Sequence, residues 1–136
     1  MIIDVYSVDI DPVLSPGLEY YGSRHFTADS SRIRFPETYF DSLVTEVPFS
    51  RTATRDVIKS IKNLSSSLKR DGRLVLMSSI DQAPELKKEI TDIGFYPYIM
   101  QKVDRKGTDV AIMGWTKSYD KYRKIKVFNN HIKSIY

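Results

Sequence analysis

Apolar residues along this chain form short runs and longer stretches with helical spacing. The short runs predict strands over residues 2–9, 24–28, 40–47, 73–78, 98–103 and 110–115. Apolar residues spaced about three to four positions apart predict one helix over residues 53–68 and a second over residues 84–93. A weaker helical stretch covers residues 12–21 and is interrupted by Pro16-Gly17. Strands and helices therefore alternate along most of the chain.

Polar and glycine residues mark where these elements begin and end. Thr52 or Thr54 is the expected N-cap of the first long helix, and Gly72 is expected to end it. Gly94 follows the second helix in the same way. The last two strands are separated by a short loop that contains Gly107, which predicts an antiparallel hairpin.

Alternating strands and helices followed by a hairpin indicate a fold class. We expect an α/β protein, a three-layer sandwich with a mostly parallel sheet and a C-terminal antiparallel hairpin. Ligands of such sheets bind at the carboxyl ends of the strands. The residues at those ends are Asp9 and Asp11, Asp29 to Ser31, Glu46 to Phe49, and Ser78 to Asp81.

Composition narrows the class of protein. The chain has 136 residues, 41% hydrophobic and 28% charged, which is ordinary for one globular domain. Its apolar runs are much shorter than the roughly 20 residues that span a bilayer, and residues 1–4 lack the basic start of a signal peptide. The absence of cysteine excludes disulfides and thiolate chemistry. We therefore expect a cytoplasmic protein without membrane contact and, with only two histidines, no metal site.

Charge divides the chain into an acidic front and a basic back. Residues 1–50 hold three basic and eight acidic side chains, net −5, and residues 51–136 hold 18 basic and nine acidic, net +9. Residues 118–136 read as a basic, aromatic extension of a domain formed by residues 1–117. Basic groups contact phosphates and aromatic rings stack on bases, so this extension suits nucleic acid, although a solvated surface is the simpler alternative. The alternation in Lys124 to Phe128 is also compatible with an exposed strand.

Two acidic strand ends suit a nucleoside. A carboxylate only accepts hydrogen bonds, so Asp9 could bind the two hydroxyls of a ribose, as Rossmann-like folds do at this position. The structural alternative is that the Asp11-Pro12 pair caps the following turn. Asp29-Ser30 could bind an adenine amino group or simply start a loop.

The order of these segments resembles a known family. It is carried by Val8-Asp9-Ile10-Asp11, Ala28-Asp29, the run from Phe40 to Phe49, the run from Leu68 to Leu76, and Ile93-Gly94-Phe95. Over residues 3–117 this order resembles class I S-adenosylmethionine-dependent methyltransferases from their second strand onward. The resemblance implies a Rossmann-like fold with S-adenosylmethionine as cofactor. Asp9 and the adjacent Ile10 would bind its ribose, and Asp29 with Ser30 would lie beside its adenine.

The resemblance also assigns a catalytic segment. Glu46-Val47-Pro48-Phe49 stands where amino-methylating members carry a motif of the type Asp/Asn-Pro-Pro-Tyr/Phe, and the chain is most similar to enzymes that methylate exocyclic amino groups of guanine in RNA. Glu46 would accept hydrogen bonds from the amine, and Phe49 would stack on the base next to Pro48. Glu46 is one methylene longer than Asp, and Val47 replaces a proline, which loosens the turn. The structural alternatives are a surface salt bridge for Glu46 and a core position for Phe49.

One part of the family pattern has no counterpart in this sequence. The family begins with a strand and a glycine-rich turn, and the six glycines of this chain include no such pair. The absent strand would lie between the strands predicted over residues 2–9 and 40–47, so two edges would be left unpaired. These two edges could be covered in three ways. The missing strand could come from a separate subunit corresponding to the N-terminal half or from a second copy in a homodimer that swaps an element, or the two strands could pair directly.

These observations leave three functional hypotheses. The first is methyl transfer from S-adenosylmethionine to an exocyclic amino group of a nucleic acid base, RNA before DNA. The second is a noncatalytic Rossmann-like remnant that serves as a binding or scaffolding subunit. The third is a Rossmann-type binding module, flavodoxin-like for instance, in which Asp9 and Asp11 hold a metal or a regulatory ligand.

Overall fold

The computed structural model describes residues 4–11, 17 and 22–126. Their elements are, in chain order, β1 (Tyr6–Asp9), β2 (Arg24–Thr27), β3 (Phe40–Glu46), α2 (Arg51–Leu64), the 3₁₀ turn η2 (Ser65–Ser67), β4 (Leu68–Ser79), α3 (Ala83–Ile93), β5 (Tyr96–Arg105) and β6 (Thr108–Thr116). The alternation of strands and helices that the sequence predicts is thus present. The weak helix expected over residues 12–21 lies almost entirely outside the described residues.

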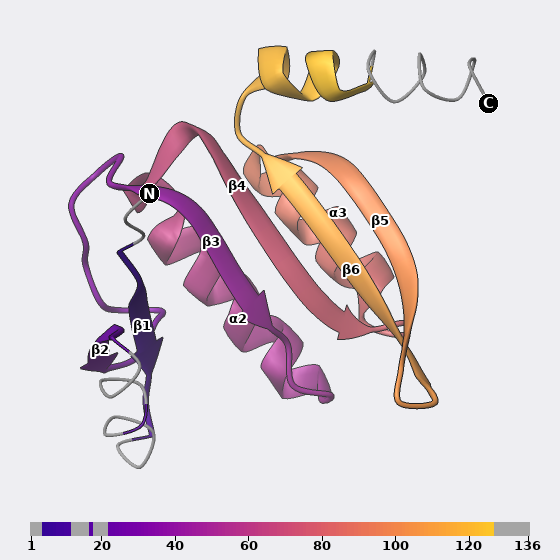
Figure 1. Ribbon diagram of the computed structural model, residues 1–136, viewed down its shortest axis with the longest axis horizontal. Helices are drawn as coiled ribbons and strands as arrows, with labels where there is room; N and C mark the ends of the chain where they lie inside the picture. Colours follow the sequence, from indigo (N-terminus) through magenta and orange to yellow (C-terminus); the bar gives the residue numbers. More distant parts are fainter. Residues whose placement is uncertain (1–3, 12–16, 18–21, 127–136) are drawn as a thin grey trace.

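The strands form two separate sheets (Figure 1). The smaller sheet pairs β1 with β2 in parallel, and the larger has the order β3-β4-β6-β5. In the larger sheet β3 and β4 are parallel, whereas β6 runs antiparallel to both β4 and β5, so three of its four strands point the same way. Lys106 and Gly107 close the terminal hairpin with positive φ angles. The predicted α/β fold with a C-terminal hairpin is confirmed.

Within the described residues, no strand lies between β1 and β3. β1 pairs only with β2, and β3 pairs only with β4, so each sheet presents one unpaired edge in addition to its outer edge. Direct pairing of these two strands, one of the three ways in which the unpaired edges could be resolved, is therefore wrong. Both strands are parallel to their neighbours, so each presents the edge of a parallel ladder.

The core lies between the larger sheet and the two long helices. Residues of α2 and α3 such as Ile58, Ile61, Leu86 and Ile90 bury their apolar stripes against alternate residues of β4 and β6, with Trp115 completely buried among them. Both helices lie on the same face of the sheet (Figure 1). The described residues thus supply two of the three expected layers, and the opposite face of the sheet has no helix of comparable length over it.

Two predicted boundaries of the first long helix are wrong. Ser50, not Thr52 or Thr54, is the N-cap, because its Oγ accepts a hydrogen bond from Ala53 N at 3.0 Å. The helix ends at Leu64 rather than near Gly72. Gly72 instead lies inside β4, in a bulge where one residue of β3, Asp41, faces four of β4. A Cβ at Gly72 would lie 2.6 Å from Cγ of Leu68, so the glycine is there because this side chain packs over its backbone.

Aromatic side chains join the small sheet to the rest of the fold. The Tyr6 ring of β1 makes edge contacts with Tyr39 and Phe40, at 5.7 and 5.2 Å between centroids, and with Phe35. The hydroxyls of Tyr6 and Tyr39 are 2.7 Å apart and hydrogen-bonded. Tyr6 and Phe40 are the first residues of their strands, so this aromatic cluster connects the two sheets at their amino ends.

The C-terminal extension begins as a helix. Residues 119–126 are helical, so an exposed strand beginning at Lys124 is wrong for the described part of the extension. Tyr122 stacks on Tyr96 of β5 at 5.6 Å, and Lys121 Nζ donates to the Asp71 carbonyl at 2.8 Å. The helix is thus attached at the amino end of β4, and some of its aromatic and basic groups serve packing.

Candidate functional site

The two acidic positions assigned to the cofactor lie next to each other. Asp9 ends β1, and its carbonyl accepts a hydrogen bond from Ala28 N at 3.0 Å, which brings the segment that contains Asp29 beside it. Asp9 Oδ1 accepts from Asp11 N at 2.8 Å, so this carboxylate also stabilises the turn that follows β1. Ile10 projects from that turn with 72% of its surface exposed. A half-exposed carboxylate and an apolar side chain are suitable for binding the hydroxyls and one face of a nucleoside.

The Asp29–Ser30 segment is held by its own loop and by α2. Asp29 Oδ1 accepts from Ser31 N at 2.9 Å and from Ser31 Oγ at 2.7 Å, and these hydrogen bonds lower the pKa of the Asp29 carboxyl. The Ser30 hydroxyl lies 2.6 Å from Ser60 Oγ, and Asn63 Nδ2 donates to the Ser30 carbonyl at 3.0 Å. The loop after β2 is therefore fixed in place, with the Ser30 side chain directed to α2.

Glu46, assigned as the acceptor for an amine, is the last residue of β3 and forms an ion pair. Its Oε1 lies 2.7 Å from Nη1 of Arg105, whose side chain also approaches Met77 Sδ at 4.0 Å. Both charged side chains are about half exposed. The salt-bridge alternative for Glu46 is therefore present. The Glu46 carboxylate remains accessible from solvent beside its partner.

The segment after Glu46 combines an anchored backbone with an exposed ring. Val47 is completely buried, and its N–H donates to the Met77 carbonyl at 2.8 Å. The next two residues turn outward, and Phe49 is 60% exposed. The core position considered as an alternative for Phe49 is therefore wrong. An exposed aromatic ring on an anchored backbone is a suitable stacking surface for a planar ligand.

Gln82 anchors this segment, and sequence analysis did not single it out. Its Nε2 donates to the carbonyls of Pro48 and Ser50, at 2.7 and 3.0 Å, and to Thr54 Oγ1 at 3.1 Å. Its Oε1 accepts from Ser79, from N at 3.1 Å and from Oγ at 2.9 Å. Gln82 thus connects the loop after β3 to the turn after β4. The available sequence signal was a glutamine just past a predicted strand end and two residues before Pro84.

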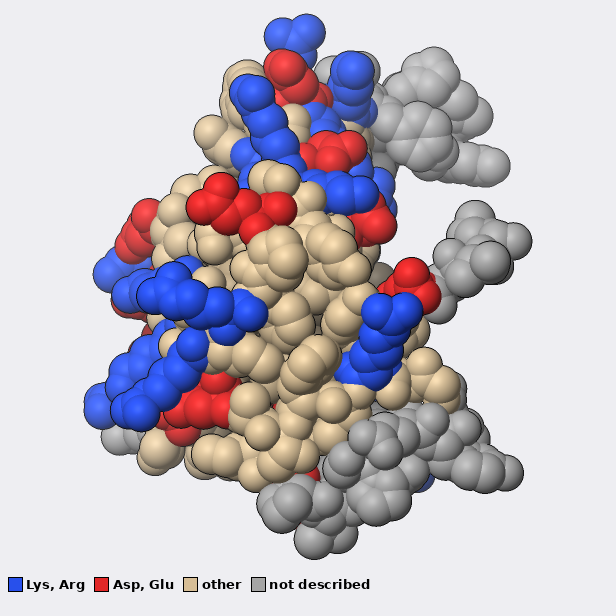
Figure 2. Space-filling model, turned by 90° about the vertical axis from the view of Figure 1, so that its left-hand side faces the viewer, with Lys and Arg blue, Asp and Glu red and all other residues tan. Residues whose placement is uncertain are grey.

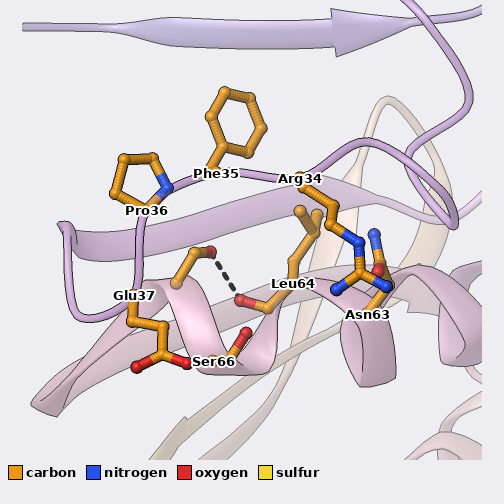
Figure 3. Close-up of a pocket in the computed structure, with 8 residues that line it drawn as sticks. Arg34, Phe35, Pro36, Glu37, Asn63, Leu64 and Ser66 are labelled. Carbon is orange, nitrogen blue, oxygen red and sulfur yellow. Dashed lines mark hydrogen bonds between the residues drawn. The ribbon is translucent and has the colours of Figure 1, made fainter.

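The hollow drawn in Figure 3 is not lined by Glu46, Pro48, Phe49 or Gln82, but one of its lining residues, Asn63, also binds the Ser30 carbonyl. It is lined by polar and apolar groups of the segment before β3 and of the end of α2, among them Arg34, Phe35, Glu37, Asn63 and Leu64. This places it at the amino ends of β3 and β4, opposite the strand end that carries Glu46. Among the described residues, no three His, Asp or Glu side chains are grouped as a metal site, and no helix is long and apolar enough to cross a membrane.

Comparison with known proteins identifies the fold. No protein-family model matches the sequence, and no curated protein is significantly similar to it. Solved structures are similar. A TehB-like S-adenosylmethionine-dependent methyltransferase from Corynebacterium glutamicum has a TM-score of 0.65 at 19% identity, covering 85% of this chain and 68% of its own. The 1,6-didemethyltoxoflavin-N1-methyltransferase of Burkholderia thailandensis, solved with S-adenosylhomocysteine, has a TM-score of 0.62 at 20% identity, covering 84% and 61%.

The chain has the fold of class I methyltransferases. At these identities the similarity concerns the fold alone, and the same fold carries another reaction in the [4+2]-cyclase SpnF (TM-score 0.67, 13% identity, 85% of this chain and 67% of that one). The chain spans about three fifths to two thirds of the length of these structures. The methyltransferase fold expected from the resemblance is confirmed. The finer resemblance, to enzymes that methylate exocyclic amino groups of guanine in RNA, stays a prediction.

Proposed function

We propose that this chain belongs to an S-adenosylmethionine-dependent methyltransferase that acts on an exocyclic amino group of a nucleic acid base, RNA rather than DNA. The observation that carries this proposal is the segment Glu46 to Phe49. Its backbone is anchored by Gln82, and it presents a carboxylate and a free aromatic ring at the carboxyl end of β3. The fold supports the cofactor, since one of the similar structures holds S-adenosylhomocysteine.

The chemistry of an exocyclic amine explains these residue types. Its lone pair is delocalised into the ring, so an acceptor that binds its N–H groups orients the lone pair toward the methyl group. Glu46 would provide that acceptor and Phe49 the ring on which the base stacks. The Pro48 carbonyl already accepts a hydrogen bond from Gln82, so its part is to fix the turn. Asp9 and Ile10 would bind the ribose of the cofactor, and Asp29 with Ser30 would lie near its adenine.

Basic groups lie at both ends of the molecule. Figure 2 shows Lys and Arg side chains at the top, mixed with acidic ones, at the end that carries residues 119–126 in Figure 1, and others at mid-height on the left. At the other end of the strands, Arg105 pairs with Glu46. Phe49 follows the carboxyl end of β3, at the lower end of the strands. At about 3.3 Å per residue, the intervening strand length is on the order of 25 Å. A nucleic acid in contact with both ends would have to extend along the sheet.

A second function is favoured by the local bonding of the carboxylates. Asp9 stabilises its own turn, Asp29 bonds to Ser31, and Glu46 pairs with Arg105. A noncatalytic subunit that binds or supports another protein would keep these contacts without using them for chemistry. The two functions differ in whether the protein binds S-adenosylmethionine.

The test is calorimetric titration with S-adenosylmethionine, performed on the chain alone and with any protein that co-purifies with it. Binding in either case supports the enzyme, and no heat in both refutes it. Asp9→Asn is the informative variant, because an amide oxygen can still accept from Asp11 N while the charge is lost. If Asp9 binds the ribose, the affinity falls at least tenfold. Unchanged affinity would show that the Asp9 assignment is wrong.

The substrate is tested on the same preparation by mass spectrometry of nucleosides after incubation with RNA. Stacking on an aromatic ring contributes about 1–3 kcal/mol per base, so Phe49→Ala should lower kcat/KM for RNA by roughly 5- to 150-fold. Phe49→Tyr should retain it. Met100→Ala is the control, since Met100 is an exposed apolar side chain on β5, outside both the loop after β3 and the basic extension. Equal losses in Phe49→Ala and Met100→Ala would contradict the role given to Phe49.

A further inference from the structure

The two edge strands of the larger sheet differ in how well they are protected from pairing with another chain. β5, the outer edge, contains Pro97, a register shift between Pro97 and Ile99, and the charged residues Lys102 and Arg105. Proline, bulges and charges of this kind prevent an outer strand from pairing with another chain. β3 forms the other edge and contains no proline, lysine or arginine. Its two charged residues are already engaged, Asp41 by Lys69 and Glu46 by Arg105.

The unpaired edge of the small sheet is equally unprotected. β1 has the sequence Tyr6-Ser7-Val8-Asp9, without proline or a basic residue. β1 and β3 thus share the features of strands inside a sheet, whereas β5 has those of a true outer strand.

The face of the larger sheet away from the helices is apolar next to the β3 edge. Val44 is 69% exposed and lies directly opposite Val75 in the parallel register. Met77 and Ile112, partners in the β4–β6 register, continue this face and are half-buried. On the helix side, the alternate residues Leu74 and Leu76 of β4 are completely buried. Among the described residues, the sheet therefore has one fully buried apolar surface and one that is partly exposed, most of all at Val44.

Strand direction limits what can fill this position. β1 and β3 point the same way in Figure 1, and each is parallel to its own neighbour. A strand that pairs with both in the manner of a parallel sheet must have the same direction. Parallel strands are joined by crossovers of a dozen or more residues, usually helices, that lie on a face of the sheet. In these two similar structures, about a third or more of the chain lies outside the matched part, which is enough for such an element.

We propose that the open edges, β1 (Tyr6–Asp9) and β3 (Phe40–Glu46), bind a strand–helix segment of a second polypeptide. Its strand pairs in parallel with both edges, and its helix covers the apolar face around Val44, Val75 and Ile112. This completes one continuous sheet from the two that the chain forms alone. The proposal goes beyond the proposed function, since a scaffolding subunit would need the same segment as an enzyme.

The experiment selects partners for the full chain from a display library of strand–helix segments about 35 residues long, with the strand positions varied among apolar residues. S-adenosylmethionine is left out, so that failure here is distinguishable from failure of cofactor binding. Selected segments are produced as peptides, and their binding is located by amide hydrogen exchange. The expected result is a 1:1 complex in which exchange slows in β1 and β3, with no change in β5.

Val44→Lys and Val103→Lys form the matched pair of variants. Both valines are exposed on strands of the same sheet, Val103 at 36%, but Val103 is on the protected edge strand β5. Val44→Lys should weaken peptide binding at least tenfold, and Val103→Lys should change it less than twofold. Circular dichroism of the free variants checks that each has kept its fold.

Several results would overturn the proposal. A library without binders, or binders that protect β5, would show that β1 and β3 do not accept this element. Slow exchange of β3 in the free chain, equal to that of β4, would show that the edge is already filled by the chain itself. Dimerisation of the free chain in sedimentation experiments, abolished by Val44→Lys, would assign the edges to a second copy.

Discussion

Gln82→Ala tests whether the loop after β3 is held as the structure indicates. The substitution removes the side chain that bonds to Pro48, Ser50, Thr54 and Ser79. A typical hydrogen bond contributes about 0.5–1.5 kcal/mol net, and the value is highest where the partner left behind is buried. Thr54 is buried, whereas Pro48 and Ser50 are exposed and their carbonyls can bind water. If the hydrogen bond to buried Thr54 counts most and those to the exposed carbonyls count least, the free energy of unfolding should fall by about 3 kcal/mol.

Gln82→Glu sharpens the same test. A carboxylate keeps the oxygen that accepts from Ser79 but replaces the amide donor with an oxygen facing the carbonyls of Pro48 and Ser50. At neutral pH this variant should be at least as destabilised as Gln82→Ala. Gln101→Ala, an exposed amide on β5, is the control and should change stability by less than about 0.5 kcal/mol.

Urea denaturation followed by circular dichroism measures both effects, and hydrogen exchange of the Ala53 and Thr54 amides reports on the start of α2. The reasoning is refuted if Gln82→Ala is as stable as the control variant. It is also refuted if Gln82→Glu equals the wild type, since the donated hydrogen bonds would then contribute nothing.

Two further predictions concern the bulge in β4 and the loop after β2. Gly72→Ala should destabilise the fold by about 1–3 kcal/mol in urea denaturation, because the added methyl would overlap Leu68 and the Lys69 carbonyl. Stability equal to that of the wild type would show that the Leu68 side chain moves aside easily. Asp29 has a lowered pKa, so its stabilising effect is complete above its unfolded pKa of about 3.8 and is lost as the pH falls through the lower folded value. Asp29→Ala should therefore be less stable than the wild type at pH 7, and urea denaturation should show this difference shrinking as the pH falls below about 3.8. A difference that stays constant would contradict the Ser31 hydrogen bonds as its cause.

The order of elements was predictable because it depends on local patterns. Apolar spacing located the strands and the two long helices, and Gly94 ends α3 in the left-handed conformation that favours glycine. The unpaired position between β1 and β3 also followed from comparing the predicted elements with the family's strand order. The boundary of α2 was missed because Gly72 is required by a contact with Leu68 inside a strand, and nearby sequence alone does not separate that from a helix end.

The candidate site was predictable in its positions but not in its contacts. Sequence reasoning placed Asp9, Asp29 and Glu46 at strand ends, where the structure also has them. The partner of Glu46 is Arg105, 59 residues away, and only the folded hairpin brings it there. Gln82 acts through carbonyl groups, which every residue possesses, so no motif distinguishes its partners. Long-range polar contacts are set by the tertiary fold, and a single sequence carries little sign of them.

The aromatic cluster at the amino ends of β1 and β3 has a consequence for ligand affinity. Ring contacts of Tyr6 with Tyr39 and Phe40 join the sheets at one end, whereas Asp9 ends β1 and Phe49 follows the end of β3. The small sheet is attached beyond the carboxyl end of β2 as well, because Ser30 bonds to Ser60 and Asn63 of α2. Repacking at Tyr39 would loosen only the first attachment. The separation between Asp9 and Phe49, and with it the room for a ligand, therefore depends on both attachments.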